Sequence, residues 1–279
     1  MTPGEIPQEL LDILDRAAGK THSREGVVAQ TLAEILTAYD RIGADGAAGG
    51  RRPVTATRKG TRQYNADAAA VHTAGVTTAA AVVDGIGNSP EIAACSLLLA
   101  EVAARVGARR GSLVGILAAA ELVADRDAAA VEPDAVAVLA VAVPEHTGVA
   151  WVGDCRAWGW DGATLTQWTT DHTVGQQLRV NGAPLDLAEA HDNWIRTSLG
   201  RAVVATVYQV TIPSDALVLL TSDGVHDALT RDELATLVRA HGDDPQVMAD
   251  AIVAAVVEDD DGYRDDATVV VIPAREDAS

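Results

Sequence analysis

One stretch organises this chain: Val82-Val83-Asp84-Gly85-Ile86-Gly87-Asn88, which closes a run of small and β-branched residues that begins at Thr77. The run is typical of a buried strand, and the strand ends in a carboxylate and a tight turn. Ser89-Pro90-Glu91 follows, with an N-cap residue, a proline at the first helical position and an acid in the first turn. The stretch therefore predicts a strand, an Asp-Gly turn and a helix.

Asp84 has two interpretations at this point. Asp-Gly is among the commonest turn pairs, so a plain turn aspartate is the simpler one. The other is a metal or phosphate site at a strand end, and it requires that similar aspartates mark the ends of neighbouring strands.

Composition narrows the class of protein. The chain has 279 residues, 48% of them hydrophobic, so it can bury a large core. Its net charge of −19 disfavours nucleic acid and anionic membranes as partners and suits cation binding. Cys95 and Cys155 lack metal-ligand spacing and fit reduced, buried side chains. The apolar runs are too short to span a bilayer and no signal peptide is evident, so a cytoplasmic protein is expected.

Two regions differ in pattern. Residues 1–50 are expected to form an N-terminal helical extension and linker, and residues 51–279 the main domain. The extension has amphipathic helical patterns at 7–17 and 25–42, followed by small residues over 43–50. Docking on the main domain, dimerisation and binding of a regulator are the roles open to it. Docking is the default, because such helices need an apolar partner.

The sequence of the main domain predicts a mixture of short strands and helix pairs. Its β-branched segments predict strands at residues 54–57, 68–73, 77–83, 135–143, 148–152, 158–160, 164–168, 203–212, 216–221 and 267–272. Apolar residues at helical spacing predict helices at 92–106, 112–127, 232–240 and 245–258, with Gly107 and Gly111 between the first two. We expect the first three strands in hairpin succession and the strands within 135–168 in one meander. This grouping favours an α+β fold with antiparallel sheets and helices packed outside them.

Aspartates recur at three further strand edges. Asp223 follows the apolar residues 217–220, Asp265 and Asp266 precede the last strand, and Asp67 precedes an early one. If these strands are neighbours, four carboxylates meet at one sheet edge and repel one another unless a divalent cation neutralises them. Ligation by oxygen alone suits Mg²⁺ or Mn²⁺, and the absence of a Cys or His cluster in the sequence disfavours zinc.

Short segments of this character follow one another in a fixed order over about residues 53–273. They are Arg62-x-x-Asn65-x-Asp67, Val83-Asp84-Gly85-Ile86-Gly87, Val152-Gly153-Asp154-Cys155-Arg156-Ala157, Thr170-Asp171-His172-Thr173, Leu199-Gly200, Thr221-Ser222-Asp223-Gly224-Val225-His226-Asp227 and Asp265-Asp266-Ala267-Thr268-Val269-Val270. In this order and spacing they resemble the signature blocks of the metal-dependent protein serine/threonine phosphatases of type 2C, including bacterial members.

The resemblance implies a four-layer α-β-β-α sandwich, in which two antiparallel sheets are flanked by helices. It also implies a site for two Mg²⁺ or Mn²⁺ ions at one edge of the sandwich. The implied ligands are the carboxylates of Asp67, Asp84, Asp223 and Asp265 and the backbone carbonyl of Gly85. Asp84 would bridge the two ions.

Three more residues take a role from the resemblance. Arg62 matches the arginine that grips the substrate phosphate, a task that suits a planar bidentate donor. Asp154 and Asp227 match positions that bind a third, weaker metal in bacterial members. Both also have a purely local interpretation, as a turn at Gly153-Asp154 and a helix cap at Asp227, so the third ion remains an alternative.

The implied activity is hydrolysis of phosphoserine and phosphothreonine in proteins by a water that two metal ions activate. The implied partners are a phosphorylated protein substrate and a cognate Ser/Thr kinase. The alternative is a catalytically weak or inactive pseudophosphatase that acts as a phosphoprotein-binding regulator. A small-molecule phosphate ester is a further possible substrate, and residues 174–193, the variable flap of the family, would set that choice.

Departures from the family pattern concern rate and substrate choice. Ile86 stands where many members carry a histidine that protonates the leaving group, so water or another residue such as His172 would have to donate that proton. Ala66 replaces a polar neighbour of the first metal aspartate, and Asp266 replaces an asparagine. None of these changes removes a predicted metal ligand.

A basic cluster precedes the first metal aspartate. It consists of Arg51, Arg52, Arg58, Lys59 and Arg62 in an otherwise acidic chain. Steering of a phosphorylated substrate is one interpretation, and a solvated strand face, Arg62 excepted, is the other.

Overall fold

The structure is a computed structural model that describes residues 51–124 and 133–275. The predicted helices at 7–17 and 25–42 lie outside these residues, as does the predicted domain boundary near residue 50. The domain division therefore stays a prediction. No helix in the described part of the chain is both long and apolar enough to cross a membrane.

Two five-stranded sheets with antiparallel pairing form the centre of the fold. The order of strands is β1-β10-β9-β6-β7 in one, called the β1 sheet, and β2-β3-β4-β5-β8 in the other, called the β3 sheet. The strands are β1 (Val54–Arg58), β2 (Asp67–Ala74), β3 (Thr77–Gly85), β4 (Ala135–Ala142), β5 (His146–Val152), β6 (Arg156–Trp160), β7 (Leu165–Gln167), β8 (Tyr208–Pro213), β9 (Leu217–Thr221) and β10 (Ala267–Ile272).

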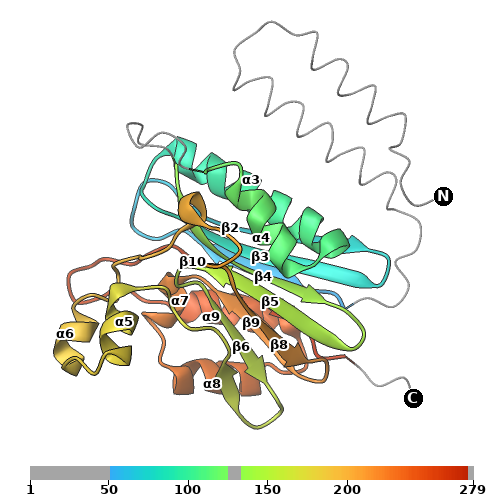
Figure 1. The fold of residues 1–279 in the computed structure, drawn as a ribbon. Coiled ribbons are helices and arrows are strands. Elements are labelled where there is room, and N and C mark those ends of the chain that lie inside the picture. Colours follow the sequence, from blue (N-terminus) through green and yellow to red (C-terminus); the bar gives the residue numbers. More distant parts are fainter. Residues whose placement is uncertain (1–50, 125–132, 276–279) are drawn as a thin grey trace, which may run out of the picture. The chain divides into compact units, whose positions relative to one another are not determined.

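Helices cover the outer faces of both sheets. The helices of the described residues are α3 (Pro90–Arg110), α4 (Ser112–Ala120), α5 (Val174–Val180), α6 (Leu185–Glu189), α7 (Asp223–His226), α8 (Arg231–Ala240) and α9 (Pro245–Ala255), with a 3₁₀ turn η1 (Leu199–Arg201). Helices α3 and α4 lie over the β3 sheet, and α8 and α9 lie over the β1 sheet (Figure 1). Three clusters of buried side chains fill the spaces between successive layers. The four-layer α-β-β-α sandwich is therefore confirmed.

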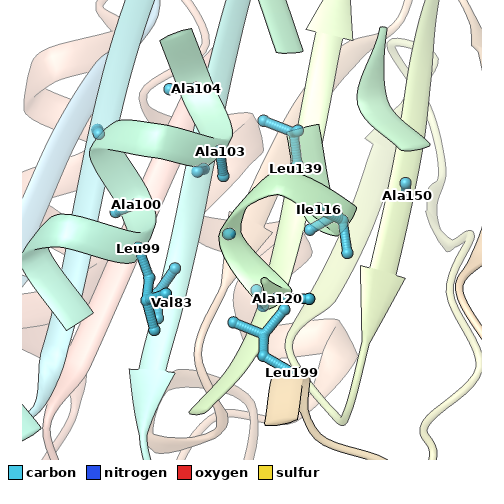
Figure 2. Close-up of a cluster of buried hydrophobic side chains, with 14 of the residues drawn as sticks. Val83, Leu99, Ala100, Ala103, Ala104, Ile116, Ala120, Leu139, Ala150 and Leu199 are labelled. Atoms are coloured by element: carbon cyan, nitrogen blue, oxygen red, sulfur yellow. The ribbon is translucent and has the colours of Figure 1, made fainter. Parts of the chain in front are cut away.

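Strand β3 is buried on both of its faces, which explains its unbroken apolar run. Ala79, Ala81 and Val83 belong to the cluster under α3 and α4, in which Figure 2 labels Val83, while Ala80 and Val82 belong to the cluster between the sheets. Because successive residues of a strand point to opposite faces, both sets must be apolar. The run thus delivers Asp84, which is partly exposed, to the end of a strand whose residues 78–83 are buried.

Helix α3 begins as the sequence predicts, with the Ser89 hydroxyl accepting a hydrogen bond from the Ile92 amide at 3.3 Å. The predicted break at Gly107 is wrong, because this residue lies inside α3. A Cβ there would come within 2.9 Å of a methyl group of Leu139, so glycine permits close packing on the sheet. Gly111 does separate α3 from α4, which ends at Ala120, short of the predicted 127.

Strand positions were predicted better than strand partners. Strand β1 pairs with β10 and not with β2, so the expected hairpin succession is wrong there. The connection between β1 and β2 spans residues 59–66, longer than most hairpin loops, and crosses to the other sheet. The expected single meander is also wrong, since β6 pairs with β9 after the chain turns at Gly153, whose φ is 95°. Residues 203–206 form a turn, and β8 begins only at Tyr208.

Substitution of Gly115 would test how closely α4 packs against α3 and the β3 sheet. Alanine in a helix interior usually stabilises by about 1 kcal/mol relative to glycine. A Cβ at Gly115, however, would lie 2.4 Å from a Leu139 methyl group and 2.6 Å from the Ala103 carbonyl oxygen. We therefore expect Gly115→Ala to lower the free energy of unfolding by about 1–3 kcal/mol, measured by urea denaturation. Val114→Ala, on the exposed face of the same helix, is the control, with a change of about 0.5 kcal/mol or less.

Candidate metal centre

The predicted carboxylates come from strand ends that meet at one end of the sandwich. Asp67 opens β2 and lies directly opposite Asp84 at the end of β3. Asp223 follows β9, Asp265 precedes β10, and these two strands are neighbours in the other sheet. One carboxylate pair therefore comes from each sheet.

A buried serine connects the two sheets at this end. The Ser222 hydroxyl donates a hydrogen bond to Asp67 Oδ2 at 2.6 Å and accepts one from the Thr268 amide at 3.0 Å. Ser222 is fully buried and precedes Asp223 in the chain. Its bond holds the Asp67 carboxylate beside the end of the β1 sheet, where Asp223 begins α7.

The carboxylates raise one another's pKa values. Burial raises the pKa of Asp84 well above its usual range, and the charges of Asp223, Asp67 and Asp154 raise it further. Burial and the charge of Asp223 likewise raise the pKa of Asp67, against the lowering effect of the Ser222 hydrogen bond. The pKa of Asp154 is raised to about 8, by burial first and then by Asp223. The raised pKa values of these three aspartates indicate that nearby positive charge does not balance their negative charge.

The donor set fits a hard divalent cation. Its side chains supply carboxylate oxygens, which Mg²⁺ and Mn²⁺ prefer, and a cation would relieve the repulsion that the pKa values record. Within residues 51–124 and 133–275, no three His, Cys, Asp or Glu side chains are already arranged as a metal-binding group. The carboxylates thus meet at one end of the sandwich without forming a ready-made metal-binding group among the described residues.

Gly85 has a packing reason as well as a predicted ligand role. Its amide donates to the Ala66 carbonyl at 3.1 Å. A Cβ at Gly85 would lie 2.5 Å from Ser96 Oγ and 2.6 Å from an Ile92 methyl group. Glycine is therefore required for α3 to pack beside the end of β3.

Arg62 brings a positive charge to the site. Its guanidinium donates to Asp265 Oδ2 at 2.9 Å and lies over the Tyr263 ring, 5.5 Å from the centroid. The Tyr263 hydroxyl donates to the same carboxylate oxygen at 2.9 Å. Sequence reasoning missed Tyr263, although it stands two residues before Asp265.

A cleft opens beside these residues. It has a volume of about 450 Å³, and its lining includes Asp223, Asp227, Asp265, Tyr263 and the flap residue Asn193. Acidic groups, an aromatic ring and a neighbouring arginine at one opening can receive a phosphate ester once a cation balances the carboxylates.

Comparison with known proteins identifies the architecture. Neither a protein-family model nor a curated protein matches the sequence. A bacterial serine phosphatase structure matches at a TM-score of 0.70 and 18% identity, covering 82% of this chain and 100% of that one. The PPM Ser-Thr phosphatase of Mycobacterium smegmatis, solved with cacodylate, matches at 0.62 and 24% identity, covering 81% and 99%. The Mycobacterium tuberculosis phosphatase PstP/Ppp matches at 0.60 and 22% identity, with the same coverage.

The chain has the fold of the bacterial serine/threonine phosphatases. At these identities the likeness shows the fold alone. The roles of the individual residues in this phosphatase fold have to be argued from their own contacts.

Asp266 is a residue whose contacts explain its identity. It is buried, and its carboxylate accepts hydrogen bonds from the amides of Gly60 at 2.7 Å and Ala66 at 2.8 Å. Ala66 is itself buried, which suits a small apolar side chain. These two departures from the family pattern therefore form one structural contact that holds the loop before Asp67.

The Leu199-Gly200 block supports the Asp84 turn. The Ser198 hydroxyl and the Gly200 amide both donate to the Asp134 carboxylate. The Asp134 carbonyl in turn accepts the Ile86 amide at 2.9 Å. Asp134 was missed, because a carboxylate that only accepts hydrogen bonds from a distant turn leaves no local motif.

The positions proposed for a third ion share a neighbourhood. Asp154 is buried in the turn after β5, and Asp227 is exposed at the end of α7. A further acid, Asp171, is paired with Arg156, whose Nη2 lies 2.6 Å from it. A salt bridge thus already neutralises Asp171, whereas Asp154 has a pKa raised by nearby acids.

The predicted basic cluster does not act as one patch. Arg58 donates to carbonyls at the end of α9, with the Val256 oxygen at 2.9 Å, and so satisfies a helix C-terminus. Lys59 donates to the Arg62 carbonyl at 2.9 Å. Arg51 contacts the turn between β4 and β5, at the other end of the β3 sheet. These contacts favour the structural interpretation for Arg51, Arg58 and Lys59.

Neither histidine near the site is placed to donate a proton in the cleft. His172 is buried against Trp151 and Tyr208, and its Nδ1 accepts the Gly153 amide at 3.3 Å. His226 bonds Thr221 Oγ1 at 2.9 Å, and burial lowers its pKa well below the usual range. Neither ring lines the cleft described above.

The raised pKa values predict how stability depends on pH. A carboxyl group with a raised folded pKa stabilises the fold while protonated, and this stabilisation is lost as pH rises from its unfolded value, about 4, through its folded value. The metal-free protein should therefore melt at lower temperature at pH 8 than at pH 5. Mg²⁺ or Mn²⁺ should restore several degrees at pH 8, because about 1 kcal/mol shifts Tm by about 2–4 °C.

Asp84→Asn should raise the metal-free Tm at pH 8 and reduce the shift on adding metal. Asp215→Asn, an exposed aspartate in the turn after β8, is the matched control and should leave both values unchanged. A wild-type Tm that does not change when Mg²⁺ or Mn²⁺ is added would contradict the assignment of a cation site.

Proposed function

We propose that the chain is a metal-dependent phosphatase that hydrolyses phosphoserine and phosphothreonine in proteins. The observation that carries the proposal is the convergence of buried and partly buried carboxylates without a balancing charge, beside Arg62 and an open cleft. The phosphatase fold supports the reaction class, and the acidic site supports the need for metal.

The proposed metal-binding residues are Asp67, Asp84, Asp223, Asp265 and the carbonyl of Gly85. When bound, Mg²⁺ or Mn²⁺ supplies Lewis acidity and lowers the pKa of a water molecule. Ser222 keeps Asp67 oriented through its 2.6 Å hydrogen bond. Asp154 and Asp227 are the proposed binders of a third ion.

Arg62 is the proposed phosphate-binding residue. Its guanidinium has five N–H donors in a planar fork, of which one contacts Asp265. The other N–H donors of the fork would be available to phosphoryl oxygens. Tyr263 keeps its proton, because burial and its hydrogen bond to Asp265 raise its pKa to about 12.

The substrate class follows from the shape of the site. Asp223 and Asp265 line an open cleft that also includes Asn193, a residue of the flap next to α6. An open cleft admits a phosphorylated side chain on a protein surface. A phosphorylated protein, supplied by a Ser/Thr kinase, is therefore the proposed partner.

Ile86 favours a second candidate function. It is 46% exposed and cannot donate a proton, and no histidine of the described chain lines the cleft. A weak or inactive pseudophosphatase that binds phosphoproteins would keep the fold and the carboxylates without rapid turnover. Hydrolysis of an aryl phosphate and of a phosphothreonine peptide, with Mn²⁺ and then with chelator, separates the two functions. Metal-dependent binding without hydrolysis would support the regulator.

Removing a central carboxylate should abolish turnover. We expect Asp223→Asn and Asp84→Asn each to lower kcat/KM for an aryl phosphate with Mn²⁺ by at least about 100-fold, because metal charge stabilisation contributes several kcal/mol. Circular dichroism checks that both variants fold. Asp215→Asn serves again as the control with unchanged activity. Near-normal turnover in either variant would overturn the assignment.

Supplying a proton donor at position 86 should favour poor leaving groups. Ile86→His places an imidazole on an exposed position two residues after Asp84. General acid catalysis is typically worth about 100-fold or more, so we expect kcat for a phosphothreonine peptide to rise by about 10-fold or more. An aryl phosphate with a good leaving group is the internal control and should change little. An equal change for both substrates would argue against a missing general acid.

A further inference from the structure

A second cleft lies on the β3 sheet, away from the candidate metal centre. It has a volume of about 510 Å³ and is lined by the start of α4 and by parts of β4, β5 and β8. On β4, Val136 pairs with Asp84, whereas Val141, five residues further along, lines this cleft. At about 3.3 Å per residue, the cleft is some 17 Å from Asp84. Its occupant would not compete with a substrate at the metal centre.

A glycine forms the notch at the centre of this cleft. Gly148 pairs with Val141 on one side and with Thr211 on the other, so these three residues share one face of the sheet. Val141 belongs to the core under α3 and α4, which identifies this face as the helix side. A Cβ at Gly148 would lie 3.7 Å from Ser112 Oγ and 4.0 Å from His146 Nε2. Both polar atoms therefore border the notch.

Ser112 offers an unused hydrogen bond there. It is only 9% exposed, and its hydroxyl has no hydrogen-bond partner among the residues that the structure describes. It is also the first residue of α4, a nine-residue helix whose N-cap is Gly111 and has no side-chain cap. The first amides of a helix carry partial positive charge and bind anions when no side chain caps them.

This end of the sheet gathers cations in an acidic chain. Arg110 and His146 line the cleft, and Arg51 and Arg275 both donate to the adjoining turn between β4 and β5. None of the three arginines has a carboxylate partner within the described residues. Glu145, in the same turn, is exposed and does not line the cleft. The local charge therefore attracts anions although the net charge is −19.

We propose that this cleft binds a small organic anion. Its phosphate, sulfonate or carboxylate group would contact Ser112, the start of α4, Arg110 and His146. Its apolar body would lie against Val114, which is exposed, and Val141. The volume is within the usual range for small-molecule sites, about 300–1,000 Å³. The inference does not depend on the proposed phosphatase activity.

Anilinonaphthalene sulfonate, which joins a sulfonate to an apolar body, is a suitable probe for fluorescence titration of the full chain. Gly148→Val should fill the notch, because the new Cβ would meet no atom closer than 3.7 Å outside its two neighbouring residues. Arg110→Gln should remove the charge. We expect each to raise the Kd of the probe at least about 10-fold, a change of about 1.4 kcal/mol. Arg231→Gln, an exposed arginine on α8, is the matched control and should stay within about twofold.

Two further measurements distinguish binding of the anionic group from binding of the apolar body. Phenylnaphthylamine, the same body without a sulfonate, should bind at least about 10-fold more weakly, and inorganic sulfate should displace the sulfonate probe. Circular dichroism verifies that each variant folds. The proposal is overturned if Gly148→Val and Arg110→Gln leave the Kd unchanged, or if the neutral probe binds as tightly as the anionic one.

Discussion

The repulsion among buried and partly buried carboxylates is the constraint on which the rest of this structure depends. Asp67 and Asp84 are held opposite each other by the register of β2 and β3, and burial together with Asp223 raises the pKa of both. Like charges in a poorly solvated place destabilise a fold unless other contacts hold them there. The Ser222 bond to Asp67 and the two amides on Asp266 are such contacts, and both join segments that are far apart in sequence. The acidic end is thus built by long-range hydrogen bonds, and under the proposed function a cation would neutralise it.

Much of the fold could be predicted from local pattern. The positions of β3, β4 and β10 follow from their apolar runs, and the start of α3 follows from its cap. Partners could not be predicted in the same way, because a strand's own residues specify its faces and not its neighbour. The pairing of β1 with β10 depends on a loop that crosses between sheets, and that of β6 with β9 on a turn at Gly153.

The candidate site shows the same division between local and distant information. Asp67, Asp84, Asp223 and Asp265 mark strand edges, and the structure brings all four to one end of the sandwich. The residues whose hydrogen bonds support this site were harder to predict from the sequence. Asp134 accepts hydrogen bonds from a distant turn and leaves no motif of its own, and Asp266 was noted only as a departure from the family pattern, without its contacts to the Gly60 and Ala66 amides. Sequence reasoning therefore finds charged groups in a strand pattern more readily than the hydrogen bonds that orient them.

The alanines between β3 and α3 have a consequence for the precision of the acidic end. Ala79, Ala81, Ala100 and Ala103 are all buried in the same cluster as Val83. Alanine loses no side-chain rotamer freedom when it is buried, whereas a long side chain loses up to about 2 kcal/mol. This interface therefore has few alternative packings, and thermal motion has few rotamer exchanges through which to shift β3. The contacts of these alanines fix the position of the backbone that carries Asp84, because alanine has no alternative rotamers through which the packing could change.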